Sequence, residues 1–191
     1  MAVNHEIPVS PPDSMAGITE PAIKPEATSD TTQDTNLDPS IASEKEIAPH
    51  LESISRGIIN AINTRNFDAT SSPWIHVANS IETNRDSGPK GSRTVTKADL
   101  LAVFSWLGTE FPDYRIEIDS VSVVVHKAFV WSRKGCTAEV FINAQATGGP
   151  GFPLGVQRKY VNVFEFKFGE GRWLAVRETL IDGMGDFMVP A

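Results

Sequence analysis

The sequence is poor in cysteine and lacks both a long apolar run and an excess of basic residues. Cys136 is the only cysteine among 191 residues, which excludes an intrachain disulfide and a cysteine-rich zinc cluster. No stretch approaches the roughly 20 apolar residues that a membrane-spanning helix needs. The first residues show no basic segment followed by an apolar run, so no secretory signal is expected. These absences favour a cytoplasmic protein with no membrane segment and no metal.

Acidic charge is concentrated near the N-terminus. Residues 1–50 carry nine acidic residues against two lysines, whereas residues 51–191 carry equal numbers of acidic and basic residues. Without a basic excess in its folded part, the chain is not expected to bind nucleic acid. Residues 1–43 also contain no Phe, Trp or Tyr, and so little apolar bulk cannot offset the entropy lost on ordering. We predict a disordered, acidic, proline-rich tail at 1–43 and a single domain at 44–191. The tail could alternatively dock a basic partner.

Apolar spacing predicts two helices followed by a run of strands. Pro49-His50-Leu51 is expected to open the first helix, with a buried stripe formed by Leu51, Ile54, Ile58, Ala61 and Ile62. Thr96 and Asp99 are expected to cap the second helix, which Gly108 would end. The predicted strands cover residues 75–81, 114–125, 128–132, 137–147 and both limbs of 156–182. Helices first and antiparallel strands last predict an α+β domain.

The stretch Val156–Asp182 predicts a hairpin of two long strands around Gly169-Glu170-Gly171. If Phe168 faces Arg172, side chains that repeat every second residue share one face. The facing pairs would then be Phe166 with Leu174, Phe164 with Val176, Asn162 with Glu178, and Tyr160 with Leu180. A carboxylate on such an apolar face lies either at the surface or in a pocket. Desolvation in a pocket raises the pKa of a carboxyl group, which suits Glu178 to acid or base catalysis.

Other residues are candidate partners of Glu178. His76 follows Trp74 by two residues, so both could point the same way from a strand, and His76 could pair with Glu178 as acid and base. Tyr160 could donate its phenol. Asn162 could hold the carboxylate or donate to a ligand oxygen.

The candidate pocket walls are Trp74, Phe104, Phe164, Val176 and Leu180. Each candidate also has a purely structural reading. The aromatic residues and Tyr160 could simply pack in the core, and His76 could be structural or exposed. Asn162 could be a sheet-edge residue bonded to backbone. Glu178 could instead form an ion pair with Arg158 or Arg177 at the rim.

Three short strings occur in order along the chain. They are IINAINTRNFDA, ending at Ala69, FPDYRIEIDSV at 111–121, and EGRWLAVRETLID at 170–182. The first resembles the end of the first helix in the SnoaL-like branch of the nuclear transport factor 2-like (NTF2-like) superfamily. The second resembles the turn after that family's third helix, and the third resembles its closing strand. The likeness spans about residues 47–187, and the chain's ending resembles that of small uncharacterised fungal members.

The resemblance implies a curved antiparallel sheet wrapped around N-terminal helices, a cone-like α+β barrel with a deep pocket. It also implies a homodimer formed through the outer sheet face, which here contains Phe141 and Val163. It places Glu178 where limonene epoxide hydrolase and its relatives supply an acidic residue. No catalytic set of the family is complete in this chain. The hydrolase has a second acid that the string Arg158-Lys159-Tyr160 lacks. Ketosteroid isomerase, another member, has a tyrosine in its first helix, and residues 49–65 contain none.

These observations lead to two hypotheses. The first is a pocket enzyme without metal or organic cofactor, an isomerase, cyclase or dehydratase that transfers a proton on a small apolar, polyketide- or terpenoid-like molecule. Glu178 would be the acid or base, His76 or Tyr160 its partner, and Asn162 a polar orienting group. The alternative is a non-catalytic ligand-binding or dimerisation module of the same fold. A Glu178 side chain that points to solvent, or a cavity filled by side chains, would favour the module.

Overall fold

The computed structural model describes residues 37–85, 91–126, 135–151 and 156–183, all within one compact unit, Thr35–Ala191. The elements are α1 (Glu44–Thr64), a 3-10 turn η1 (Trp74–His76), β1 (Val77–Arg85), β2 (Arg93–Thr96), α2 (Lys97–Glu110), β3 (Arg115–His126), β4 (Thr137–Thr147), β5 (Arg158–Gly169) and β6 (Arg172–Asp182). The predicted strand at 128–132 and most of the predicted tail lie outside the described residues. None of the described helices is long and apolar enough to cross a membrane.

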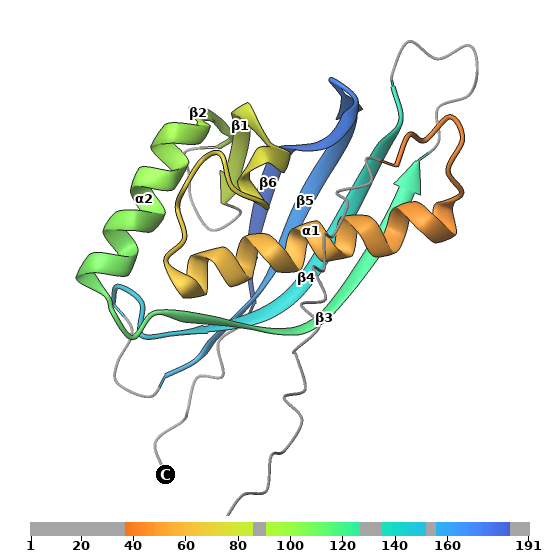
Figure 1. The fold of residues 1–191 in the computed structure, drawn as a ribbon. Helices are drawn as coiled ribbons and strands as arrows, with labels where there is room; N and C mark the ends of the chain where they lie inside the picture. The colour runs from red at the N-terminus through yellow and green to blue at the C-terminus, as the bar shows by residue number, and fades with distance from the viewer. Residues whose placement is uncertain (1–36, 86–90, 127–134, 152–155, 184–191) are drawn as a thin grey trace, which may run out of the picture. The chain divides into compact units, whose positions relative to one another are not determined.

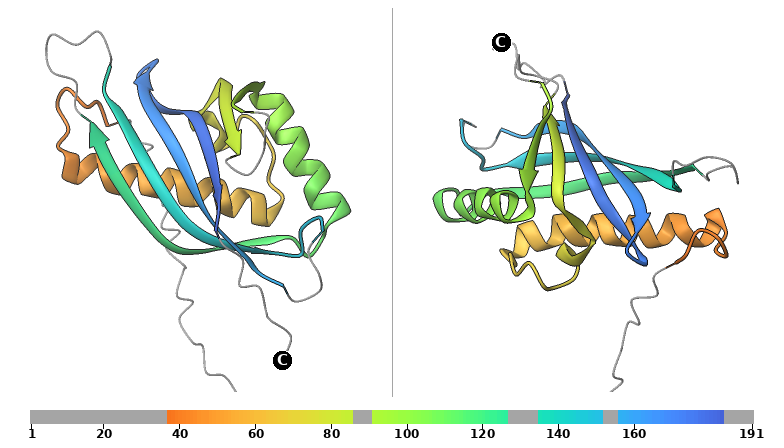
Figure 2. Two further views of the ribbon diagram at one scale, coloured as in Figure 1. Left: turned by 180° about the vertical axis from the view of Figure 1, so that it is seen from behind. Right: turned by 90° about the horizontal axis from the view of Figure 1, so that it is seen from above.

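The strands form one curved, open sheet with the order β2-β1-β6-β5-β4-β3. All neighbours are antiparallel except β1 and β6, which run parallel. α1 runs across the concave face of the sheet (Figure 1), and α2 packs beside β1 and β2 (Figure 2). The predicted α+β class and the curved sheet around N-terminal helices are therefore confirmed.

The first helix begins earlier than predicted. Ser43 is its N-cap, and Glu46 accepts hydrogen bonds from the Ser43 backbone nitrogen at 2.8 Å and from Ser43 Oγ at 2.7 Å. This capping box starts the helix, so Pro49 lies inside α1 instead of opening it. The predicted apolar stripe is buried against the sheet. Arg65 ends the helix in the left-handed conformation, with φ of 61°.

Residues just before α1 also contact the domain. The carbonyl oxygen of Leu37 accepts a hydrogen bond from Trp173 Nε1 at 2.9 Å, and Ala42 is buried. The contacts of the folded unit therefore extend upstream of residue 44, where the predicted domain starts.

The second helix begins as predicted but runs past Gly108. Asp99 N donates to Thr96 Oγ1 at 3.1 Å, and Thr96 Oγ1 donates to Asp99 Oδ2 at 2.7 Å. A Cβ at Gly108 would lie 2.7 Å from Cδ of Arg65, so the glycine makes room for that side chain. Gly108 is therefore a packing residue within α2, which ends at Glu110.

The alternation that the sequence predicts for residues 137–147 is confirmed in β4. Its inward residues Ala138, Val140, Ile142, Ala144 and Ala146 are all buried. Their small and branched side chains pack below α1, and the residues between them form the outer face.

Candidate functional site

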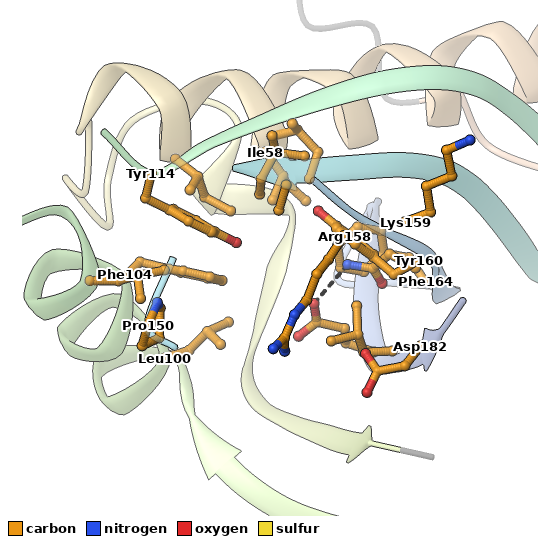
Figure 3. A pocket seen from close by; sticks show the side chains of 18 of the residues that line it. Ile58, Leu100, Phe104, Tyr114, Pro150, Arg158, Lys159, Tyr160, Phe164 and Asp182 are labelled. Carbon is orange, nitrogen blue, oxygen red and sulfur yellow. Dashed lines mark hydrogen bonds between the residues drawn. The ribbon is translucent and has the colours of Figure 1, made fainter. Parts of the chain in front are cut away.

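A cavity of about 700 Å³ lies between the two helices and the sheet (Figure 3). Its apolar walls include Ile58 and Ile62 from α1, and Leu100, Phe104 and Leu107 from α2. Trp74 backs this wall, with its ring centroid 6.0 Å from that of Phe104. The size falls in the range typical of small-molecule sites.

Polar groups gather on the opposite wall, which β5 and β6 build. The lining residues there include Arg158, Tyr160, Asn162, Glu178 and Asp182. They occupy alternate positions on each strand, so all of them face the concave side. In Figure 3 the side chain of Lys159, which lies between two of them, points the other way. The cavity is therefore apolar on its helical side and polar on its strand side.

The carboxylate of Glu178 is held by the amide of Asn162. Asn162 Nδ2 donates to Glu178 Oε1 at 2.8 Å, and this bond is the dashed line in Figure 3. Asn162 is 5% exposed, whereas Glu178 is half-buried. A charge-assisted hydrogen bond of this kind orients the carboxylate in the cavity wall.

The hairpin turn that leads to Glu178 has two residues instead of the predicted three. Gly169 pairs with Arg172, which leaves Glu170 and Gly171 as the loop, with φ of 54° and 73°. Positive φ at both loop residues is typical of a type I′ turn, whose twist matches that of the strands. The shorter loop shifts the pairing by one residue and brings Trp173 to the buried face.

A β-bulge adds a second one-residue shift in the same direction before the strand reaches the cavity. Phe164 pairs with Glu178 on β6, and Glu165 pairs with Arg177. Phe166 pairs with Ala175, so the pairing skips one residue of β6. Val176 is the extra residue, and a bulge of this kind bends the strand. Phe164 therefore faces Glu178, not Val176 as predicted. Two single-residue shifts restore the predicted inward side of Glu178, although every predicted pair is wrong.

Two tyrosines add hydroxyl groups to the cavity. Tyr160 lies in the polar wall, and Tyr114 lines the cavity at the start of β3. Burial raises the pKa of Tyr160 above its usual value, and the nearby Tyr114 and Glu178 raise it further. The Tyr160 phenol therefore stays protonated at neutral pH and can donate a hydrogen bond. Figure 3 shows Tyr114 pointing toward the residues of β5.

The backbone of Tyr114 is anchored by Arg65. Arg65 Nη2 donates to the carbonyl oxygens of Tyr114 at 2.9 Å and Pro112 at 3.1 Å, while Nη1 donates to that of Ile62 at 2.9 Å. One guanidinium thus joins the end of α1 to the start of β3. This clamp fixes the backbone from which the Tyr114 side chain enters the cavity.

His76 lies in the core and does not line the cavity. It is 1% exposed, and its Nδ1 lies 3.1 Å from the carbonyl oxygen of Trp173. Its ring packs edge-on against His50, with centroids 6.0 Å apart. Because η1 is a helical turn and not the predicted strand, Trp74 and His76 point in different directions. His50 is half-buried inside α1.

Seven of the nine predicted site residues line this cavity. They are Trp74, Phe104, Tyr160, Asn162, Phe164, Glu178 and Leu180. Val176 lies outside the cavity because it forms the bulge, and His76 lies outside for the reason given above.

Sequence reasoning missed Tyr114, Arg158 and Asp182 as lining residues. Asp182 faces Tyr160 and is exposed at the rim. It lies at an even interval after Glu178, so the same alternation could have identified it. Arg158 could have been found in the same way. Tyr114 has the same parity as Ile116 in the predicted strand at 114–125, so alternation could have identified it too, although it lies just before β3.

The described residues contain no group of three or more His, Cys, Asp or Glu positioned to hold a metal ion. The polar groups of the cavity wall include carboxylates, amides, phenols and a guanidinium. These groups can exchange protons and hydrogen-bond to a ligand.

The chain matches no protein-family model and no curated protein. Solved structures do resemble it. An NTF2-like protein from Cytophaga hutchinsonii has a TM-score of 0.50 and 12% identity, over 74% of this chain and 100% of the other. An NTF2-like protein of unknown function from Pseudomonas putida has a TM-score of 0.51 and 13% identity, over 73% and 89%. A domain of unknown function with a cystatin-like fold from Nostoc punctiforme has a TM-score of 0.52 and 13% identity, over 75% and 80%.

These similarities confirm the fold that the sequence resemblance implied. The chain has the NTF2-like, cystatin-like α+β fold. Identities this low carry the architecture and not the chemistry. The SnoaL-like branch and the fungal likeness stay predictions.

Proposed function

We propose that this chain is a cofactor-independent enzyme that transfers a proton on a small apolar molecule held in the cavity. Isomerisation, cyclisation and dehydration of a polyketide- or terpenoid-like molecule are the reactions that fit. The observation that carries the proposal is the Glu178 carboxylate, oriented by Asn162 Nδ2 at 2.8 Å in the wall of a cavity of about 700 Å³.

Glu178 is the proposed acid or base, and Tyr160 is its proposed partner. An ionised carboxylate accepts a proton from the ligand, and a protonated phenol donates a hydrogen bond to an oxygen on which negative charge develops. The position of the Tyr160 phenol on the same wall as Glu178 supports this division of roles. His76 is replaced in this proposal by Tyr160, since it packs against Trp173 in the core.

Hydrogen exchange with solvent tests the proposal without knowledge of the net reaction. Polycyclic and terpenoid ketones, with and without hydroxyl groups, are incubated with the protein in D₂O, and deuterium uptake is followed by mass spectrometry. We expect wild type to accelerate exchange into at least one ketone and Glu178→Gln to be slower by about 100-fold or more. The exposed Glu110→Gln serves as the matched control and should exchange like wild type. Equal rates for wild type and Glu178→Gln would remove Glu178 from the mechanism.

The alternative remains a ligand-binding or dimerisation module. It is supported by the same cavity and by the absence of a histidine beside Glu178 among the lining residues. The outer sheet face, where Phe141 pairs with Val163, is the proposed homodimer surface. A wild-type protein that binds ketones from the panel but exchanges none of them would favour the module.

A further inference from the structure

One polar atom in the cavity wall has no hydrogen-bond partner among the described residues. It is Oδ1 of Asn162, whose side chain is 5% exposed and lines the cavity. A buried acceptor without a donor destabilises the fold, so native proteins rarely leave one without a purpose.

The orientation of the amide is fixed by its neighbour. Nδ2 donates to Glu178 Oε1 at 2.8 Å. Turning the amide by 180° would set Oδ1 against a carboxylate oxygen, and two acceptors repel each other. Asn162 therefore donates from Nδ2 to Glu178, and its Oδ1 remains an acceptor for a donor from another group.

The neighbouring strands do not supply the missing donor. Asn162 faces the apolar Ile142 on β4 and Leu180 on β6. On β5 it lies between Phe164 and Tyr160, and the Tyr160 hydroxyl makes no hydrogen bond to Asn162 Oδ1. The other three side chains have no hydrogen to donate. The remaining open side of the residue is the cavity itself.

We infer that the ligand of this cavity carries a hydroxyl group that donates a hydrogen bond to Asn162 Oδ1, so that the natural substrate is a hydroxylated apolar molecule. The inference rests on the proposed function in so far as the cavity is the ligand site. It narrows the substrate class from apolar molecules in general to alcohols and phenols. Asn162 then sets specificity, while Glu178 transfers the proton. A site built to pair with a ligand hydroxyl rejects analogues that lack it, because its own polar group is then left unpaired.

The test compares two probes of the same ring system. 2-Naphthol has a hydroxyl donor, whereas 2-methoxynaphthalene has the same oxygen without the donor. Their dissociation constants are measured by fluorescence titration with the full chain. We expect wild type to bind 2-naphthol about tenfold more tightly, which corresponds to one net hydrogen bond of about 1.4 kcal/mol.

Two variants identify the acceptor. Asn162→Leu should bind both probes equally well, because it lacks the acceptor. Glu178→Gln should keep the preference, because the glutamine oxygen can still accept from Asn162 Nδ2 and leaves Oδ1 as before. A preference that disappears in Glu178→Gln would assign the hydroxyl to the carboxylate and overturn the inference.

Equal affinities in wild type, or no binding of either probe, would also overturn it. If Asn162→Leu fails to fold, wild type and Glu178→Gln still decide the question. These titrations measure equilibrium binding only. A failure of catalysis in the exchange experiment is therefore distinguishable from a failure of hydroxyl recognition.

Discussion

At the boundary between helix and sheet, single side chains bind backbone that lines the cavity. Asn63, near the end of α1, makes two hydrogen bonds to the backbone of one residue of β3. Its Nδ2 donates to the carbonyl oxygen of Ile116 at 2.8 Å, and its Oδ1 accepts from the Ile116 nitrogen at 2.9 Å. Ile116 is itself buried and lines the cavity, so its backbone needs these partners.

Replacing Asn63 should therefore weaken the fold. We expect Asn63→Ala to lower the free energy of unfolding by about 2 kcal/mol, since two buried backbone groups lose their partners. Urea denaturation measures the change. Asn60→Ala, an exposed position one turn earlier on α1, is the matched control and should change stability by less than about 0.5 kcal/mol. Equal losses in the two variants would show that the Asn63 pair contributes nothing specific.

At the residue scale, alternation predicted the inward side of Glu178 and the wall residues around it. The pairing itself was not predictable, because nothing in the local sequence distinguishes a two-residue turn plus a bulge at Val176 from a three-residue turn and a regular strand. His76 was placed wrongly for a related reason. A short apolar run such as Ile75-His76-Val77 suits a strand or a helical turn equally well.

At the element scale, the β5–β6 hairpin carries most of the polar wall. Its turn places Glu170, a non-glycine residue, at φ of 54°. Left-handed backbone costs most residues roughly 1–2 kcal/mol, whereas Asn and Gly tolerate it. Glu170 is therefore an unfavourable residue at this position of the turn.

Two substitutions at this turn should have opposite effects. Glu170→Asn should raise the free energy of unfolding by about 0.5–1 kcal/mol, because Asn-Gly is the favoured type I′ pair. Gly171→Ala should lower it by about 1 kcal/mol, because φ there is 73°. Thermal and urea unfolding of both variants measures the changes. A gain from Gly171→Ala, or a loss from Glu170→Asn, would contradict the assigned turn.

Some features of the two helices could be predicted from the sequence, whereas some of their boundaries were predicted wrongly. The buried stripe of α1 and the cap of α2 followed from spacing and cap chemistry. The start of α1 was predictable but was missed, because Pro49 suits a first helical position, although Ser43 and Glu46 form a capping-box pattern further upstream. Gly108 suggested a helix end, but its role depends on Arg65, which is distant in sequence.

At the scale of the whole folded unit, an ionic group on the outer face joins three strands. Arg177 on β6 contacts Glu82 on β1 at 2.8 Å and Glu165 on β5 at 2.9 Å. Glu82 also accepts a hydrogen bond from Ser92 Oγ. The hydrogen bond from Ser92, followed by that from Arg177, lowers the pKa of Glu82 below its usual 4.5. β1 and β6 are the parallel pair, so this group ties the two parts of the sheet together.

The lowered pKa predicts how stability depends on pH. A carboxyl group whose pKa is lower in the folded state stabilises the fold fully above its unfolded pKa of about 4.5, and this contribution disappears as pH falls through the folded pKa. Glu82→Gln should therefore be less stable than wild type at pH 7, and the difference should shrink below about pH 4.5. Glu110→Gln is the control. A difference that stays constant with pH would contradict the role of this carboxylate.

The fold of the whole unit could be predicted from the sequence, because the order of the elements and the three short strings indicated the same architecture. The cavity could be predicted only in part, since its apolar wall comes from α1 and α2 while its polar wall comes from β5 and β6, which follow much later in the sequence. The parallel pairing of β1 with β6 left no local trace in the sequence.

The role of Glu178 is decided by the rate of deuterium exchange from D₂O into cavity ligands, measured for wild type and for Glu178→Gln. We expect wild type to catalyse this exchange and the variant to be slower by about 100-fold or more. Exchange that proceeds at the same rate without the carboxylate would contradict this role.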